Sequence, residues 1–213
     1  MLIPFGTMKR QFSSILCLMG LVFIVSCSDD DKDYPSLVSD FLVASTDANG
    51  KITTVRLDKG TTYDIAAQGI STNAPDTLLR CIASYTLDGD KMTMYNISHI
   101  FSENPVPARS LLMAEDGTQL MDTLPRDPMK VVSLWKDGGY INMQLGMLTT
   151  GVGTHAYAFC EDSVGHYSLV HLRPQEDAES YTQKVYMSMP IPDSVGQVTF
   201  SIYTYDGIFT RTF

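Results

Sequence analysis

The chain has 213 residues, 44% of them hydrophobic and 10% aromatic, so it can fold around a packed core and is not a disordered chain. Its length allows one large domain or two small ones. It has 15 basic and 24 acidic residues, a net charge of −9. That charge argues against a nucleic-acid partner held through phosphate contacts.

The N-terminal segment has the pattern of a secretory signal. Lys9 and Arg10 precede an eleven-residue apolar run, Ile15–Val25. This run is too short to cross a bilayer of about 30 Å, which needs about 20 apolar residues. The Ile-Val-Ser-Cys sequence that ends at Cys27 resembles a lipobox, where bacterial lipoprotein signal peptidase cuts before a lipidated Cys. We expect residues 1–26 to be a lipoprotein signal peptide; the alternative is an ordinary signal peptide with a chance Cys.

The residues that follow the expected cleavage site are acidic. Residues 27–36 form an acidic tether, and its run of Ser28, Asp29, Asp30 and Asp31 resembles the export signal that Gram-negative gut anaerobes use to send lipoproteins to the cell surface. A solvated tether is the plainer interpretation. Two or more acyl chains, such as palmitate, anchor a protein stably. We therefore expect a lipid-anchored outer-membrane protein that faces the exterior.

The mature chain has the pattern of β-strands joined by tight turns. Turn residues such as Asn-Gly and Asp-Gly tolerate positive φ and favour hairpins. Apolar residues alternate with polar ones in several of these segments, as in antiparallel sheets with one packed face. The predicted strand pairs are 41–46 with 52–57, 77–87 with 92–100, 130–135 with 140–145, and 197–205 with 208–213.

A hinge divides the mature chain into two modules. Asn104-Pro105-Val106-Pro107 restricts the backbone and removes two hydrogen-bond donors, so a central strand is not expected there. Residues 37–107 then hold about five strands, enough for a small barrel, and residues 108–213 form an antiparallel β-sandwich. The first module has five basic and eight acidic residues, a net of −3, so it lacks the positive groove that single-stranded nucleic acid requires.

The stretch from Arg126 to Met143 resembles the NigD-like family, small lipoproteins of gut and oral anaerobes. The family pattern is Asp-Pro-apolar-Lys-Val, then a Trp, then Gly-Gly-Tyr-apolar-Asn, and all of it is present at matching spacing. The segment 91–100 is similar to the strand that closes the family's N-terminal module. The resemblance implies an OB-fold barrel followed by a β-sandwich. It carries over no catalytic residues, and the family's name comes from a bacteriocin-associated gene neighbourhood.

We interpret the family stretch as a folding motif. Pro128 fixes the start of a strand, and Gly138 and Gly139 permit a tight hairpin. Trp135, the only Trp, is expected to fill the sandwich core, with its indole N–H bonded to an acceptor. The alternative is that the stretch forms a ligand platform.

Cysteines, histidines and acidic residues give no strong chemical motif. Cys81 and Cys160 lie among apolar residues, so buried free thiols are favoured over a disulfide. His155, His166 and His171 do not match a metal-ligand spacing and are expected on the surface. We expect neither metal nor cofactor. The acidic residues outside the tether are expected in solvated loops, although paired carboxylates of this kind can act in a hydrolase: Glu161, Asp162, Glu176, Asp177 and Glu179.

Four tripeptides resemble the Asp-Ser/Thr-apolar acceptor of bacterial protein O-glycosylation. Their acceptor residues are Thr77, Thr123, Ser163 and Ser194. Several of them fall in predicted loops, where a glycan has room. We therefore expect modification at one or more of these positions.

The sequence thus predicts an all-β, lipid-anchored envelope protein of NigD-like type. We expect it to act as a non-enzymatic binding module for an unknown glycan, peptide or envelope protein. A bacteriocin-associated self-protection role and a hydrolase with dispersed acidic residues are the alternatives.

Overall fold

The computed structural model describes residues 37–65 and 70–213. The predicted signal peptide, the lipidation site Cys27 and the acidic run Ser28 to Asp31 lie outside the described residues. Within the described part, no helix is long and apolar enough to cross a membrane.

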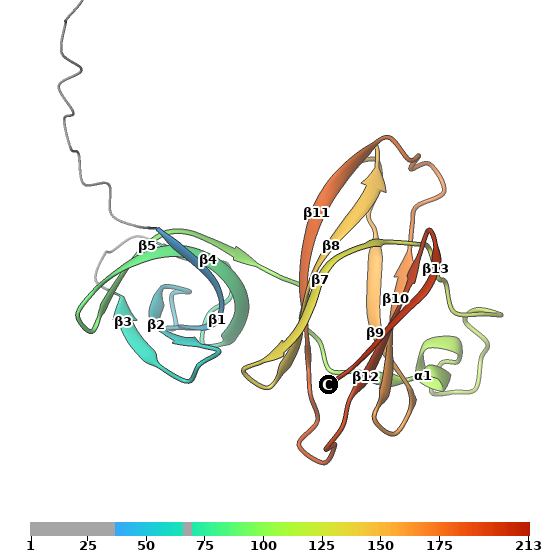
Figure 1. Cartoon of the computed structure of the whole chain (residues 1–213), viewed down its shortest axis with the longest axis horizontal. Helices are drawn as coiled ribbons and strands as arrows, with labels where there is room; N and C mark the ends of the chain where they lie inside the picture. Colours follow the sequence, from blue (N-terminus) through green and yellow to red (C-terminus); the bar gives the residue numbers. More distant parts are fainter. Residues whose placement is uncertain (1–36, 66–69) are drawn as a thin grey trace, which may run out of the picture. The chain divides into compact units, whose positions relative to one another are not determined.

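The first module is a closed five-stranded barrel (Figure 1). Around the barrel the strand order is β1-β2-β3-β5-β4, with all neighbours antiparallel except β3 and β5. This is a five-stranded barrel of OB type, as predicted. The strands are β1 (Val38–Thr46), β2 (Ile52–Leu57), β3 (Thr62–Ile65), β4 (Leu78–Asp88) and β5 (Lys91–His99).

Alternating apolar residues fill the barrel. In β2, for example, Ile52, Val55 and Leu57 are buried while Thr53 and Arg56 face solvent. Burial of these side chains is the main favourable contribution to the stability of the module. The rest of the core comes from the other strands: Leu42, Ala44, Cys81, Ala83, Tyr85, Met92 and Met94.

The second module is a β-sandwich of two sheets with strand orders β13-β12-β10-β9-β6 and β11-β8-β7. Its core is rich in Met and aromatic residues, including Met143, Met187 and Phe200. The only helix of the described residues, α1 (Ala108–Leu112), is a short connection. The strands are β6 (Val106–Pro107), β7 (Lys130–Asp137), β8 (Tyr140–Thr149), β9 (Ala156–Ser163), β10 (His166–Leu172), β11 (Tyr181–Pro190), β12 (Thr199–Thr204) and β13 (Gly207–Thr212).

The hinge lies partly within the sandwich. The sequence placed the boundary after Pro107, but β6 pairs with β9 in the larger sheet, so that sheet takes in the last two residues assigned to the barrel. The position of β6 at the sheet edge suits Pro107, which cannot donate a ladder hydrogen bond. The sandwich also contains two parallel pairs, β6 with β9 and β10 with β12, which hairpin signals do not reveal.

Candidate functional site

A buried arginine joins the two modules. Arg80, in β4 of the barrel, is only 5% exposed and forms a two-pronged ion pair with Asp58. Its guanidinium also donates to Asn142 Oδ1 at 2.8 Å and to Ser188 Oγ at 3.1 Å, both in the sandwich. Asn142 in turn donates to Asp58 Oδ2 at 3.0 Å. A buried charge is tolerated only with partners of this kind.

Aromatic rings complete the environment of Arg80. The guanidinium carbon lies 4.0 Å from the ring centroid of Tyr140 and 5.6 Å from that of Phe41, both within cation–π range. Gly138 has φ +59°, and a Cβ there would lie 2.6 Å from the Asp58 carboxyl carbon. The position therefore needs glycine for its backbone angle and for the approach of Asp58.

The Gly-Gly-Tyr-apolar-Asn part of the family stretch therefore does more than close a hairpin. Gly138 admits Asp58, Tyr140 lies beneath Arg80, and Asn142 bonds both members of the ion pair. The folding-motif interpretation is sharpened by this geometry, because the stretch builds the contact between barrel and sandwich.

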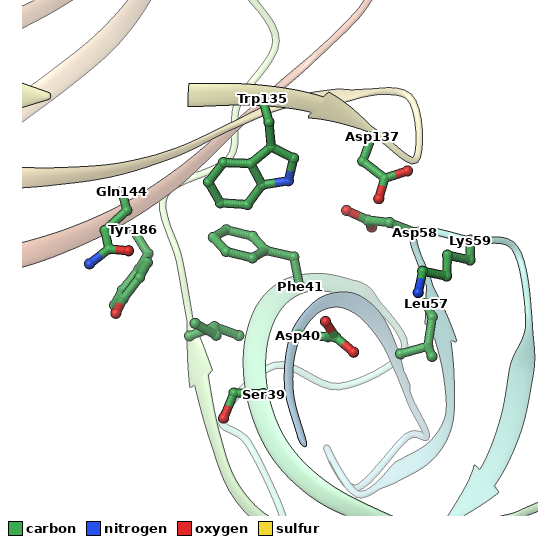
Figure 2. Close-up of a pocket in the computed structure, with 11 residues that line it drawn as sticks. Ser39, Asp40, Phe41, Leu57, Asp58, Lys59, Trp135, Asp137, Gln144 and Tyr186 are labelled. Atoms are coloured by element: carbon green, nitrogen blue, oxygen red, sulfur yellow. The ribbon is translucent and has the colours of Figure 1, made fainter. Parts of the chain in front are cut away.

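An open cleft of about 320 Å³ lies beside this cluster (Figure 2). Its aromatic wall consists of Phe41 from β1, Trp135 from β7 and Tyr186 from β11. The Phe41 ring meets Trp135 nearly edge-on, with centroids 5.2 Å apart, and Tyr186 at 6.0 Å. The prediction that Trp135 fills the sandwich core is wrong: it is half-buried and packs against a barrel residue.

Carboxylates line the same cleft. Asp40 Oδ2 accepts from Tyr85 at 2.6 Å, and Asp137 Oδ1 accepts from the Gly138 amide at 2.9 Å. Burial, followed by the bond to Asp40, raises the pKa of Tyr85, so its hydroxyl remains a donor. Among the described residues, no hydrogen bond engages the second oxygen of either carboxylate. Of the described residues that line this cleft, Lys59 is the one cation, so this lining is acidic overall.

A second polar cluster lies inside the sandwich. His155 Nδ1 is 2.9 Å from His171 Nε2, and His155 Nε2 is 3.0 Å from Asp177 Oδ2. His171 Nδ1 is 3.1 Å from the Asp127 carbonyl oxygen. The prediction of surface histidines is wrong for this pair, since His171 is only 2% exposed, while His166 does lie on the surface.

The surroundings of this cluster shift the pKa of two of its members. Burial lowers the pKa of His171, which favours its neutral form. For Asp177, burial opposes ionisation, but hydrogen bonds from Thr150 outweigh this and hold its pKa well below the usual range.

The other acidic and cysteine residues do not assemble a reactive site. Asp177 is only 5% exposed, so the expectation that it lies in a solvated loop is wrong. Glu179 pairs with Arg173 at 3.0 Å on the surface. Cys81 and Cys160 are free and buried, as predicted, and burial raises the pKa of each thiol to about 11. In the described part of the chain, no three His, Cys, Asp or Glu side chains converge as a metal site requires.

The four predicted acceptor residues for glycans differ in exposure. Thr123, Ser163 and Ser194 are exposed, whereas Thr77 is half-buried next to β4. The exposed three offer a hydroxyl that an enzyme can approach, and O-glycosylation stays a prediction for them.

Sequence reasoning did not identify most of the cleft and its neighbouring cluster. Arg80 carried a usable signal, because a cation within the apolar run Leu79–Ile82 must find a buried partner. Asp40, Phe41 and Tyr186 carried none. In the sequence each looks like an ordinary strand residue. Their shared site exists only because the packing of barrel and sandwich places β1 and β11 at the same cleft.

Comparison with solved structures places the fold. A NigD-like immunity protein from Bacteroides caccae matches 84% of this chain and 93% of its own length, with 26% sequence identity and a TM-score of 0.63. This likeness in sequence and fold confirms the predicted resemblance to the NigD-like family.

Two further structures share the NigD-like fold. A toxin-related protein from Parabacteroides distasonis has a TM-score of 0.66 at 15% identity and covers 84% of this chain and 92% of its own. A lipoprotein from Bacteroides fragilis has a TM-score of 0.52 at 10% identity, covering 84% and 96%. No protein-family model matches the sequence, and no curated protein matches it.

Proposed function

We propose that this NigD-like protein is anchored by lipid on the outer face of the outer membrane and protects the cell by binding a ligand in the cleft. In this proposal it acts without catalysis. The cleft is the observation that carries the proposal. It combines exposed parts of Trp135 and Tyr186 with carboxylate oxygens of Asp40 and Asp137 that no donor in residues 37–65 or 70–213 engages.

Such a surface is the kind that binding sites use. Partly buried aromatic rings supply contact area at low entropic cost, and a few polar groups fix the orientation of the ligand. Within the described residues, the ionisable groups of the other buried cluster are engaged with one another, which leaves the cleft as the better candidate.

The proposed cellular location rests on the sequence. The lipobox at Cys27 and the acidic run after it support lipidation and export. The Bacteroides fragilis structure of the same fold is described as a lipoprotein, which is consistent with that address. The protective role is supported by the Bacteroides caccae protein, described as an immunity protein, and by the toxin-related protein from Parabacteroides distasonis.

Toxin challenge of a deletion strain tests the protective role. We expect the deletion to sensitise cells to the toxin of a sibling strain and the unaltered protein to restore survival. A Trp135→Leu protein should fail to restore it. Tyr95→Leu is the matched control, because Tyr95 is 54% exposed and lies outside the cleft. Immunoblots confirm equal amounts. Unchanged survival of the deletion strain contradicts the protective role.

Three further measurements test the cellular location and the mode of action. Mass spectrometry of the native protein should find acyl chains on Cys27 and no leader peptide. Protease treatment of intact cells should remove the folded modules but not periplasmic controls. Incubation with glycan and peptide panels should give no turnover, and turnover of any panel member overturns the non-catalytic assignment.

A further inference from the structure

We propose that the cleft holds the basic side chain of an extended peptide, which continues along a second groove past Tyr186. This inference rests on the proposed binding function and names the class of its ligand. It follows from the chemistry of the cleft, its charge, and the strand edge beside it.

The molecule already holds one guanidinium with the same chemical groups. Arg80 lies over the rings of Phe41 and Tyr140 and is paired with Asp58. The open cleft shares Phe41 and offers Trp135 and Tyr186 as further rings. Aromatic faces and carboxylates together attract a cation, especially where water is partly excluded.

The charge of the cleft favours a cationic occupant over a neutral one. Asp58 is neutralised by Arg80, so the remaining charged residues that line the cleft are Asp40, Asp137 and Lys59. In Figure 2, the Asp137 carboxylate projects towards the side of the cleft on which Asp58 lies. One incoming guanidinium or ammonium balances the excess carboxylate, and among the described residues each aspartate has one oxygen that no hydrogen bond engages and that can accept from a cation.

The protein as a whole also favours a basic partner. Removal of residues 1–26 deletes two of 15 basic residues and none of 24 acidic ones, so the net charge changes from −9 to −11. A strongly acidic protein attracts basic ligands and speeds their association. A neutral glycan gains nothing from this field.

A second groove leads away from the cleft and suits a peptide backbone. It has a volume of about 680 Å³ and shares Ser39, Ile82 and Tyr186 with the cleft. Hydroxyl and amide side chains line it together with apolar ones, and the ammonium group of Lys184 disfavours a second cation there. The ligand is therefore a peptide with one basic anchor rather than a run of basic residues.

The edge of β11 beside this groove has backbone groups for strand pairing. The Ser188 amide donates outward to the Phe101 carbonyl at 3.0 Å, and β11 pairs with β8 in unbroken register on its other side. Alternate residues of a strand present their amides to the same side. The amides of Lys184 and Tyr186 therefore point away from β8, as that of Ser188 does. An extended peptide can continue the pairing that Phe101 begins.

Fluorescence titration of the full-length protein tests this inference, because Trp135 is the only Trp of the chain and lies in the cleft. The probe is the peptide acetyl-Thr-Val-Arg-Val-Thr-amide, and the comparison peptide replaces Arg with citrulline, which keeps the shape and removes the charge. We expect the Arg peptide to change Trp135 emission and to bind about tenfold more tightly than the citrulline peptide.

Variants locate the site. Asp40→Asn and Asp137→Asn should each weaken binding of the Arg peptide, and asparagine still accepts the existing hydrogen bonds from Tyr85 and Gly138. Asp193→Asn, an exposed residue outside the cleft, makes the same charge change and should have no effect. An N-methyl group on the peptide backbone should weaken binding if the strand edge is used.

The outcomes separate this inference from the function on which it rests. Equal affinity of the Arg and citrulline peptides overturns the cationic class but leaves the cleft as a binding site. A change of Trp135 emission with chitotetraose and not with either peptide overturns the peptide class in the same way. If no probe changes the emission while Trp135→Leu still abolishes protection, the peptide-binding inference fails and the proposed binding function stands. If Trp135→Leu also leaves protection unaffected, the inference and the proposed binding function both fail.

Discussion

Two neighbouring regions of this protein use the same chemical groups in opposite ways. The Arg80 cluster is closed: its cation, its carboxylate from Asp58 and its amide from Asn142 are all engaged with one another. The cleft beside it has rings and carboxylates, and Lys59 is its only cation among the lining residues that the structure describes. Closed polar clusters fix how two modules pack, whereas open ones are available to ligands. The histidine pair belongs with the closed kind.

Loss of the buried guanidinium of Arg80 should change the free energy of unfolding more than any other substitution proposed here. Arg80→Met leaves Asp58 and Asn142 buried without their cation, and we expect the free energy of unfolding to fall by about 3–5 kcal/mol in urea titrations. The double variant Arg80→Met/Asp58→Asn should be less destabilised than the single one, because no lone charge remains. A loss below about 1 kcal/mol for Arg80→Met contradicts a closed, structural role.

Gly138 and Gly139 of the β7–β8 hairpin offer a matched pair of positions, at which substitution by Ala should lower the free energy of unfolding by different amounts. Both have positive φ, but a Cβ at Gly138 meets Asp58 at 2.6 Å, whereas one at Gly139 meets nothing within 4 Å. Gly139→Ala should cost only the backbone strain, about 1 kcal/mol. Gly138→Ala should cost about 1–3 kcal/mol more, because it forces Asp58 away. Equal unfolding free energies of the two variants contradict a requirement for close approach.

The histidine pair should make stability depend on pH. Burial holds the pKa of His171 below its ordinary 6.5, and the neighbouring His155 and Arg173 also lower it. The unfolded chain therefore binds more protons below about pH 6.5, and stability falls on acidification. The low pKa of Asp177 adds to this loss only below its ordinary value of 3.8.

Urea unfolding at a series of pH values measures this effect. We expect the protein to lose on the order of 1 kcal/mol between about pH 7 and pH 5. His171→Gln should abolish this part of the pH dependence, and His166→Gln, on the exposed surface, should keep it. Identical pH profiles for the two variants contradict the assigned role of the pair.

Quenching of Trp135 fluorescence gives the smallest and most local effect. Carboxylates near the ring should concentrate caesium ions and repel iodide ions. The ratio of the caesium to the iodide quenching constant should fall about twofold in Asp40→Asn/Asp137→Asn and stay unchanged in Asp193→Asn. A ratio that does not respond to the double variant shows that the cleft has no excess negative potential.

Local signals predicted the strands, and the structure confirms them where hairpins join them. Turn residues such as Asp47, which accepts two backbone amides, and Gly138 placed the antiparallel pairs correctly. The parallel pairings of β3 with β5 and of β10 with β12 have no local signal, because their partners are far apart in the chain. The same limit explains the errors over Trp135 and His171, whose neighbours come from distant segments.

The sequence by itself determined the all-β class, the family resemblance and the expected lipid address, because periodicity, turn residues and the lipobox are properties of neighbouring residues. Only the tertiary structure decided which polar residues are engaged with one another in closed clusters and which line the open cleft. Arg80 and Asp58 are 22 residues apart, and Arg80 and Ser188 are 108 apart. Charge and burial at such pairs depend on how the barrel and the sandwich pack, and no local pattern records that.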